Sequence, residues 1–435
     1  MKIKTINFYS MNKKLLTLIG FIFFFASIQA QHFDSYFETK TLRLDYVHTG
    51  NLDAEIIKPV EYWEKTGWEG IKSRLIDSSN LGSLIFQIYD SLTQQLIFSK
   101  SYSTLFEEYR TTEKGEIEIR TFLESIVFPK PKNTVKIVFE SLDRRLQKQE
   151  VSSFYLNPKQ TKPTKMTKEH QVLDLHIGGT NETCLNILIV PDGYSKKESA
   201  KLKADMARIG NYILECTPFK ENKHQINLRG IEGYSKQSGI TDPNAKILKK
   251  TLIGTSFNTI DVDRYLMCED VWKLHQVADD APYDAILILA NTSKYGGGGI
   301  YNFYATVYAD GDEKRIAYVS VHELGHSIGG LADEYYTSEV SVQDYYPLDI
   351  EPAEPNLTTL VNFDAKWKSL LDPNTPVPTP NDKTFTEVLG VYEGGGYCAK
   401  GVYRPWLNCT MKESIYNNFC PVCKQALERA INQKK

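Results

Sequence analysis

Apolar and polar residues alternate in short runs through the first third of the chain. Five such runs lie between residues 40 and 142, each bounded by turn-forming residues: KTLRLDYVHTG, SLIFQIYDS, QQLIFSKSYS, GEIEIRTFLESIVFP and NTVKIVFESL. Successive side chains of a strand point to opposite faces, so this alternation predicts half-buried strands, with no convincing helix among them. We predict a β-sandwich of immunoglobulin-like or jelly-roll type over residues 31–157, with a structural or adhesive role.

A different pattern follows a polar, lysine- and proline-rich linker at residues 158–170. The runs NILIV and AILILA are apolar enough for buried strands, and HQINLRGIEG predicts another strand. Helical periodicity lies between these runs, at Lys196–Phe219 and over residues 262–280. Alternating strands and helices predict an α/β domain with a twisted mixed sheet over residues 171–435. The fold class is therefore α+β, with more than one domain.

One motif in the second half carries metal chemistry. The sequence His322-Glu323-Leu324-Gly325-His326 follows an apolar run and precedes a pair of glycines that favour a helix end. Residues four apart lie on one face of a helix, so His322 and His326 can bind one ion. Glu323 then lies beside that ion as a general base. The pattern predicts one catalytic Zn²⁺ ion on an active-site helix.

A catalytic zinc ion needs a third protein ligand and an open position for water. No histidine follows His326 in the chain, so the third ligand must be of another type. Asp333 is our first candidate, because a carboxylate can bind zinc and the doubled glycine lengthens the turn before it. Glu334 is the second candidate. A more distant carboxylate, such as Glu339 or Asp344, is the rival arrangement.

A run of four glycines precedes the predicted metal helix, in KYGGGGIYNFYATVYA. It lacks the Lys-Ser/Thr ending of a phosphate-binding loop, which excludes that function. Glycines that lead into an aromatic strand suit the close approach of another backbone. We expect a polypeptide substrate to add as an extra strand near Gly296–Tyr304. A flexible loop before an ordinary strand is the alternative.

The N-terminus has the pattern of a secretory signal peptide at residues 1–30. Two lysines precede the apolar run LLTLIGFIFFFA, and the small residue Ala30 marks the expected cleavage site. No other run is long enough to span a membrane. Cleavage would remove four lysines and no acidic residue, and would move the net charge from −3 to −7. An exported acidic protein without a basic patch is a poor candidate for nucleic-acid binding.

Seven cysteines are present, and none precedes Cys184. In an oxidising compartment we expect the four nearest the C-terminus to form disulfides. The pairing cannot be deduced, and the odd total leaves at least one thiol free. A structural zinc site is the alternative, for which only Cys420-x-x-Cys423 has ligand spacing.

The motifs VHELGHSIGGLADEYY, GGGGIYN, NCTM and FCPVC together resemble the IgA-peptidase family of secreted zinc metallopeptidases. The resemblance covers most of the mature chain. It implies a metzincin-like catalytic domain behind an N-terminal β-rich domain. It also implies zinc on His322 and His326, catalysis by Glu323, and a methionine turn at Met411.

These features predict a secreted zinc-dependent endopeptidase. Tyr403 is a candidate for stabilising the oxyanion of the transition state. One alternative is an exported protein- or glycan-binding module with a structural or vestigial metal site, although such a module would not need Glu323. Another is a metal-dependent amidase or deacetylase, which would show no endopeptidase cleavage.

Overall fold

The computed structural model describes residues 32–336 and 345–434 of the 435-residue chain. The predicted signal peptide lies outside these residues. Among the described helices, none is both long and apolar enough to cross a membrane.

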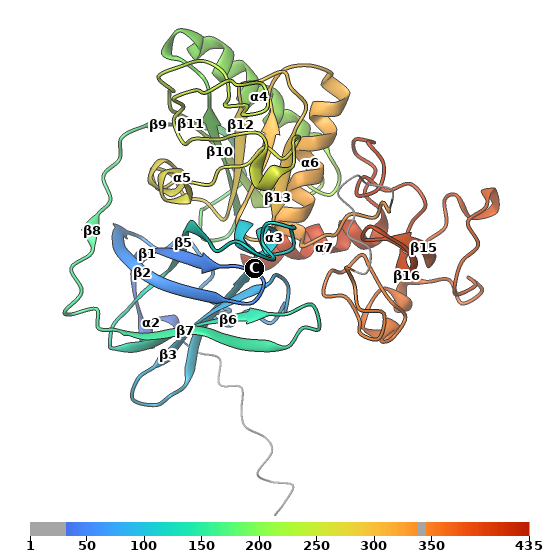
Figure 1. The fold of residues 1–435 in the computed structure, drawn as a ribbon, viewed down its shortest axis with the longest axis horizontal. Helices are drawn as coiled ribbons and strands as arrows, with labels where there is room; N and C mark the ends of the chain where they lie inside the picture. The colour runs from blue at the N-terminus through green and yellow to red at the C-terminus, as the bar shows by residue number, and fades with distance from the viewer. Residues whose placement is uncertain (1–31, 337–344, 435) are drawn as a thin grey trace, which may run out of the picture.

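Two four-stranded sheets form the N-terminal part, at the lower left in Figure 1. Their orders are β5-β1-β2-β8 and β4-β3-β6-β7, and every pairing is antiparallel except β2 with β8. Two short helices, α2 and α3, accompany them. The bounds are α2 Phe33–Tyr36, β1 Phe37–Gly50, β2 Glu55–Thr66, β3 Leu84–Asp90, β4 Leu96–Tyr102, α3 Leu105–Tyr109, β5 Arg120–Pro131, β6 Val135–Leu142, β7 Lys148–Leu156 and β8 Thr164–Lys165.

Both sheets contribute to one hydrophobic core. Phe86 of β3 is fully buried and lies 5.1 Å from the ring of Phe128 in β5, across the two sheets. Tyr46 of β1 similarly meets Phe139 of β6 at 5.1 Å. Such buried aromatic pairs hold the sheets face to face. The immunoglobulin-like or jelly-roll class stays a prediction.

A six-stranded mixed sheet forms the second part, in the order β13-β14-β12-β10-β11-β9. The four central strands are parallel, and the edge strands β13 and β9 are antiparallel to their neighbours. The α+β prediction with a mixed sheet is thereby confirmed. The bounds are β9 Gln171–Ile177, β10 Leu185–Asp192, β11 Ile226–Glu232, β12 Ala285–Ala290, β13 Gly297–Ile300 and β14 Tyr304–Tyr308.

Helices cover both faces of this sheet. Ile187 and Ile189 of β10 face α4 (Ser199–Glu215) and α6 (Glu313–Gly329), whereas the alternate residues of β10 face α5 (Val271–Ala278). The N-terminal domain packs on the α5 side through α3 and β5. Trp272 of α5 donates a hydrogen bond to the backbone oxygen of Glu124, 2.9 Å away. The helix predicted over residues 262–280 forms only in its second half, as α5.

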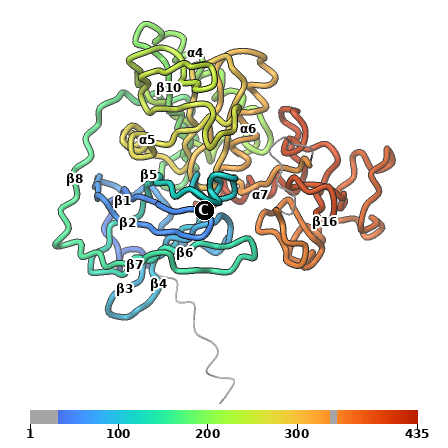
Figure 2. Tube along the Cα trace, viewed as in Figure 1, coloured from blue at the N-terminus to red at the C-terminus, as the bar shows by residue number. Residues whose placement is uncertain are grey.

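The last part of the chain wraps around the end of α6. Residues 345–420 are mostly irregular, with one hairpin of β15 (Tyr392–Gly395) and β16 (Cys398–Arg404), and they extend to the right in Figure 2. Helix α7 (Pro421–Ile431) then packs against α6. The chain ends beside the N-terminal domain, where Lys434 donates to the backbone oxygen of Glu69.

Candidate metal centre

Helix α6 carries the His-Glu-x-x-His motif and has defined ends. Asp312 caps its N-terminus by accepting hydrogen bonds from the backbone nitrogens of Lys314 and Arg315. At the C-terminus Gly330 has a φ of 59°, a left-handed conformation that suits glycine. This turn redirects the chain so that Asp333 comes back toward the helix.

Two imidazole nitrogens and one carboxylate oxygen converge beside α6. The Nε2 atoms of His322 and His326 are 3.1 Å apart, and Oδ1 of Asp333 lies 3.2 Å from the first and 3.3 Å from the second. We call these residues the histidine–aspartate cluster. Ligands at about 2.0–2.1 Å from a tetrahedral zinc ion would be about 3.3 Å from each other. The observed spacing fits that ion.

The hydrogen bonds of the imidazoles support the same conclusion. Nδ1 of His322 lies 3.0 Å from the backbone oxygen of Thr410, and Nδ1 of His326 lies 2.6 Å from that of Leu331. Carbonyls accept, so each Nδ1 carries a proton, and in its neutral form each ring then directs an Nε2 lone pair toward Asp333. The Oδ1 atom of Asp333 is buried without a hydrogen-bond donor. Three acceptors that converge without a donor fit a bound cation.

Protonation is the alternative way to stabilise this group of acceptors. Burial disfavours an imidazolium, yet the Asp333 carboxylate raises the pKa of His326 to about 9. The imidazoles in turn hold the pKa of Asp333 far below its usual range, against the effect of burial. A metal ion would replace that proton, since metal ligands must be deprotonated.

The structure separates the two candidate third ligands. Asp333 belongs to the histidine–aspartate cluster, and its Oδ2 accepts a hydrogen bond from the Tyr397 hydroxyl. The Glu334 side chain points elsewhere, with Oε1 at 3.0 Å from Nδ2 of Asn356. The more distant candidates Glu339 and Asp344 lie outside the described residues.

The side chain of Glu323, in α6, faces the glycine-rich strand β13. A Cβ at Gly297 would be 3.1 Å from Oε1 of Glu323, and a Cβ at Gly299 only 2.3 Å from its backbone oxygen. The glycines therefore allow β13 to lie directly against α6. Burial raises the pKa of the Glu323 carboxyl, which suits a proton acceptor that works near neutral pH.

Met411 lies beneath the helix. Its side chain is fully buried, and its Sδ would be 2.9 Å from a Cβ at Gly325, in the turn between the two histidines. The preceding Thr410 supplies the carbonyl that orients His322. This segment thus supports the metal helix from the side opposite β13.

Comparisons with known families agree with these motifs. The model of the family described as IgA Peptidase M64 matches residues 173–388 and 381–431, and the model described as Peptidase M64 N-terminus matches residues 32–153. The chain belongs to the IgA peptidase M64 family. No curated protein sequence matches it. Membership makes the chain a peptidase of a metallopeptidase family, with a polypeptide as substrate.

The N-terminal domain of this peptidase contacts the segment that follows the glycine run, where the backbone nitrogen of Ser103 donates to the backbone oxygen of Tyr301, 2.9 Å away. In α3 of the same domain, burial raises the pKa of the Glu108 carboxyl to about 7. The charges of His326 and Glu323 also act on it. Glu108 could not be singled out from the sequence, because nothing in a predicted sandwich marks one acidic residue among many. Tyr397 was missed for a similar reason, since the chain has 26 tyrosines.

The predicted disulfides are not present. All seven cysteines are free, and Sγ of Cys409 is 3.7 Å from Sγ of Cys423, compared with about 2.05 Å in a disulfide. Cys398 lies apart in β16, near Leu357 and Val402. Cys409 and Cys423 instead gather with Cys420 around a buried carboxylate.

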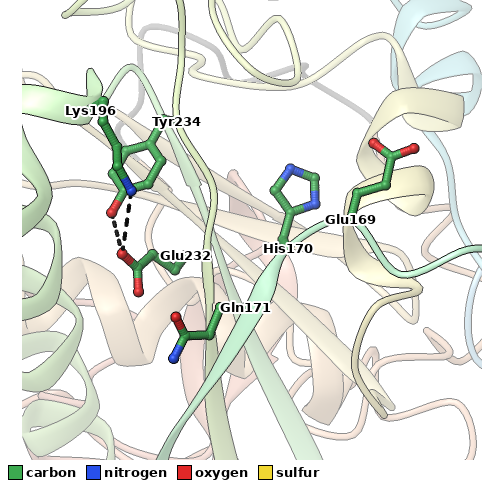
Figure 3. A pocket seen from close by; sticks show the side chains of 6 residues that line it. All are labelled: Glu169, His170, Gln171, Lys196, Glu232 and Tyr234. Atoms are coloured by element: carbon green, nitrogen blue, oxygen red, sulfur yellow. Dashed lines mark hydrogen bonds and ion pairs between the residues drawn. The ribbon is translucent and has the colours of Figure 1, made fainter.

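A separate pocket of about 400 Å³ opens beside β9 and β11 (Figure 3). Glu232 in its lining already has partners: it accepts a hydrogen bond from Tyr234 and lies 3.9 Å from Nζ of Lys196. His170 is paired with Asp280. None of the lining residues belongs to the histidine–aspartate cluster, so this pocket adds nothing to the metal centre.

Proposed function

We propose that the chain is an exported zinc-dependent endopeptidase, with His322, His326 and Asp333 as metal ligands and Glu323 as general base. The observation that carries the proposal is the convergence of three acceptor atoms within 3.1–3.3 Å, without a donor, beside a glutamate of raised pKa. A binding module would not need that glutamate.

Zinc at this position would act as a Lewis acid and lower the pKa of a bound water toward about 7. Glu323 accepts the proton of the attacking water and delivers it to the leaving amine. The carbonyls of Thr410 and Leu331 keep both imidazoles in the tautomer that presents Nε2. Tyr397 orients the third ligand by its hydrogen bond to Oδ2 of Asp333.

The substrate binds in an extended conformation along the edge of the sheet at Gly296–Tyr304. Support comes from β13, which is an edge strand antiparallel to β14 and packs against the helix that bears Glu323. Tyr265 forms a bridge with Gly297, so at that residue the edge is already paired. Tyr403 remains a candidate for the oxyanion; its backbone pairs with Thr358 and Glu393.

The proposed function also implies an order of segments along the chain. Residues 1–30 direct export, residues 31–157 form a β-sandwich and residues 158–170 connect it to a metzincin-like catalytic domain at 171–435. The separate family matches to residues 32–153 and 173–431 support two units.

The test is zinc-dependent cleavage of an unfolded protein. Purified enzyme should cleave it, a chelator should stop cleavage, and added Zn²⁺ should restore it. Asp333→Ala should lose one zinc ion per chain and the activity. Asp280→Ala is the matched control, because Asp280 is also a buried carboxylate beside a histidine, with Oδ2 at 2.8 Å from Nδ1 of His170. Full zinc content in Asp333→Ala would refute its role as ligand.

A further inference from the structure

A second group of metal-binding side chains lies behind the first. Four ligand atoms of buried residues come within 4.8 Å of one another. We call these residues the cysteine–glutamate cluster: Glu334, Cys409, Cys420 and Cys423. They are at most 2 % exposed, so solvent does not hydrate their polar atoms.

The spacing of this cluster fits a metal ion better than a covalent bond. Sγ of Cys409 lies 3.7 Å from Sγ of Cys423, and the latter lies 3.2 Å from Oε1 of Glu334. Sulfurs at about 2.3 Å from a tetrahedral zinc ion would be about 3.8 Å apart. Zinc with three sulfurs and one oxygen would be fully coordinated, as structural zinc sites are.

Backbone groups around the sulfurs favour thiolates. Sγ of Cys409 accepts hydrogen bonds from the backbone nitrogens of Met411 and Cys420, at 3.5 Å and 3.4 Å. Sγ of Cys420 accepts one from the backbone nitrogen of Cys423, at 3.4 Å, in the first turn of α7. Helix N-termini and backbone donors stabilise the thiolate, which is the form that binds metals.

The carboxylate of this cluster is an independent sign of a missing partner. Glu334 has no exposed surface, and although Asn356 donates to Oε1, the Oε2 atom has no hydrogen-bond partner. A buried carboxylate oxygen without a partner is unfavourable. Arg404 contributes positive charge nearby, but its Nη1 donates to the carbonyls of Glu393 and Gly394. A cation bound by the three cysteines and Oε1 would neutralise the charge of this buried carboxylate.

We propose that Glu334, Cys409, Cys420 and Cys423 bind a second, structural zinc ion. Thiolate sulfur selects zinc over calcium and magnesium, and binding releases the thiol protons to solvent. No oxidation is involved. The proposal stands independently of the peptidase mechanism, since it uses none of the residues of the histidine–aspartate cluster.

The two clusters share two chain segments, which suggests what the second ion does. Asp333 faces the histidines and its neighbour Glu334 faces the cysteines. The second shared segment is Cys409-Thr410. The carbonyl of Thr410 accepts a hydrogen bond from Nδ1 of His322, and Cys409 belongs to the cysteine–glutamate cluster. A backbone hydrogen bond of 2.8 Å from Glu334 to Met411 joins the segments. Zinc at the cysteines would therefore fix the position of the catalytic third ligand.

The experiment measures zinc and thiols in the full-length mature protein, purified without chelator. We expect two zinc ions per chain, and seven thiols after denaturation with a chelator. Cys409→Ala and Cys423→Ala should each lose at least one zinc ion. Cys216→Ala is the control, because it removes a buried cysteine outside the cluster and should keep both ions.

His326→Ala keeps the test valid if the cysteine variants fail to fold. This variant should retain one ion, and its Co²⁺ form should show the near-ultraviolet band of thiolate-to-cobalt charge transfer. One zinc ion per chain in the wild type with none in His326→Ala would overturn the proposal. Five thiols would also overturn it, because they would show that two cluster cysteines form a disulfide.

Discussion

Tyr397 is the residue through which metal binding by the proposed third ligand, Asp333, can be weakened without removing Asp333. Its hydroxyl donates to Oδ2 of Asp333, while Oδ1 faces the two histidines. Tyr397→Phe keeps the ring, which packs 5.4 Å from that of Tyr335, and leaves Oδ2 buried without that donor. Loss of a partner that orients a ligand weakens metal binding by about 10- to 100-fold. This is about 1.4 to 2.8 kcal/mol in binding free energy.

The assay is competition for Zn²⁺ between the protein and a chelator of known affinity, followed by cleavage measured at saturating zinc. Tyr392→Phe is the matched control, because Tyr392 lies in the same hairpin and its hydroxyl donates to the backbone oxygens of Phe385 and Val388, away from the metal ligands. The control should lose stability but no zinc affinity. Equal zinc affinity in Tyr397→Phe and wild type would refute the orienting role.

Two further predictions concern stability and packing. Despite burial, Glu124 and Glu55 together raise the pKa of His48 to about 9 from an unfolded value of about 6.5. The two ion pairs should add up to about 3 kcal/mol to the free energy of unfolding below pH 6.5, and this stability should be lost as the pH rises through 9. Denaturant titrations of the wild type should show the free energy of unfolding fall as the pH rises. The same fall in His48→Gln would contradict the assignment of this pH dependence to His48. Gly299→Ala places a Cβ 2.3 Å from the backbone oxygen of Glu323. The substitution should lower the free energy of unfolding by about 1–3 kcal/mol and should also lower the peptidase activity. Gly210→Ala, which meets only side chains, should change both far less, and equal effects would refute the packing argument.

Periodicity predicted those strands in which burial alternates or is complete. The runs NILIV and AILILA became β10 and β12, which are buried throughout. Strand β2 was missed because Pro59 and a largely exposed face remove the alternation, and the pairing with β1 is irregular there. Strand β7 was missed because its outer position leaves most of it exposed. Tertiary pairing forms both strands, and local pattern does not encode it.

The helix that carries the His-Glu-x-x-His motif could be predicted because four-residue spacing is a local property. Asp333 could be proposed only as one of several carboxylates, because the turn at Gly330 decides which side chain comes back to the histidines. A structural zinc site was the alternative that the spacing of Cys420 and Cys423 offered, but the place of Glu334 in the cysteine–glutamate cluster could not be predicted, since Glu334 precedes Cys409 by many residues. Export suggested disulfides instead, which the positions of the sulfurs do not support.

The most direct test of the account compares cleavage of an unfolded protein by wild type and by Glu323→Ala, with zinc measured in the same samples. Glu323 is proposed as the proton acceptor and not as a ligand, so the variant should keep the zinc content of the wild type. Its cleavage rate should fall by at least about 100-fold, the lower end of general acid–base contributions. Undiminished cleavage by the zinc-loaded variant would contradict the central claim.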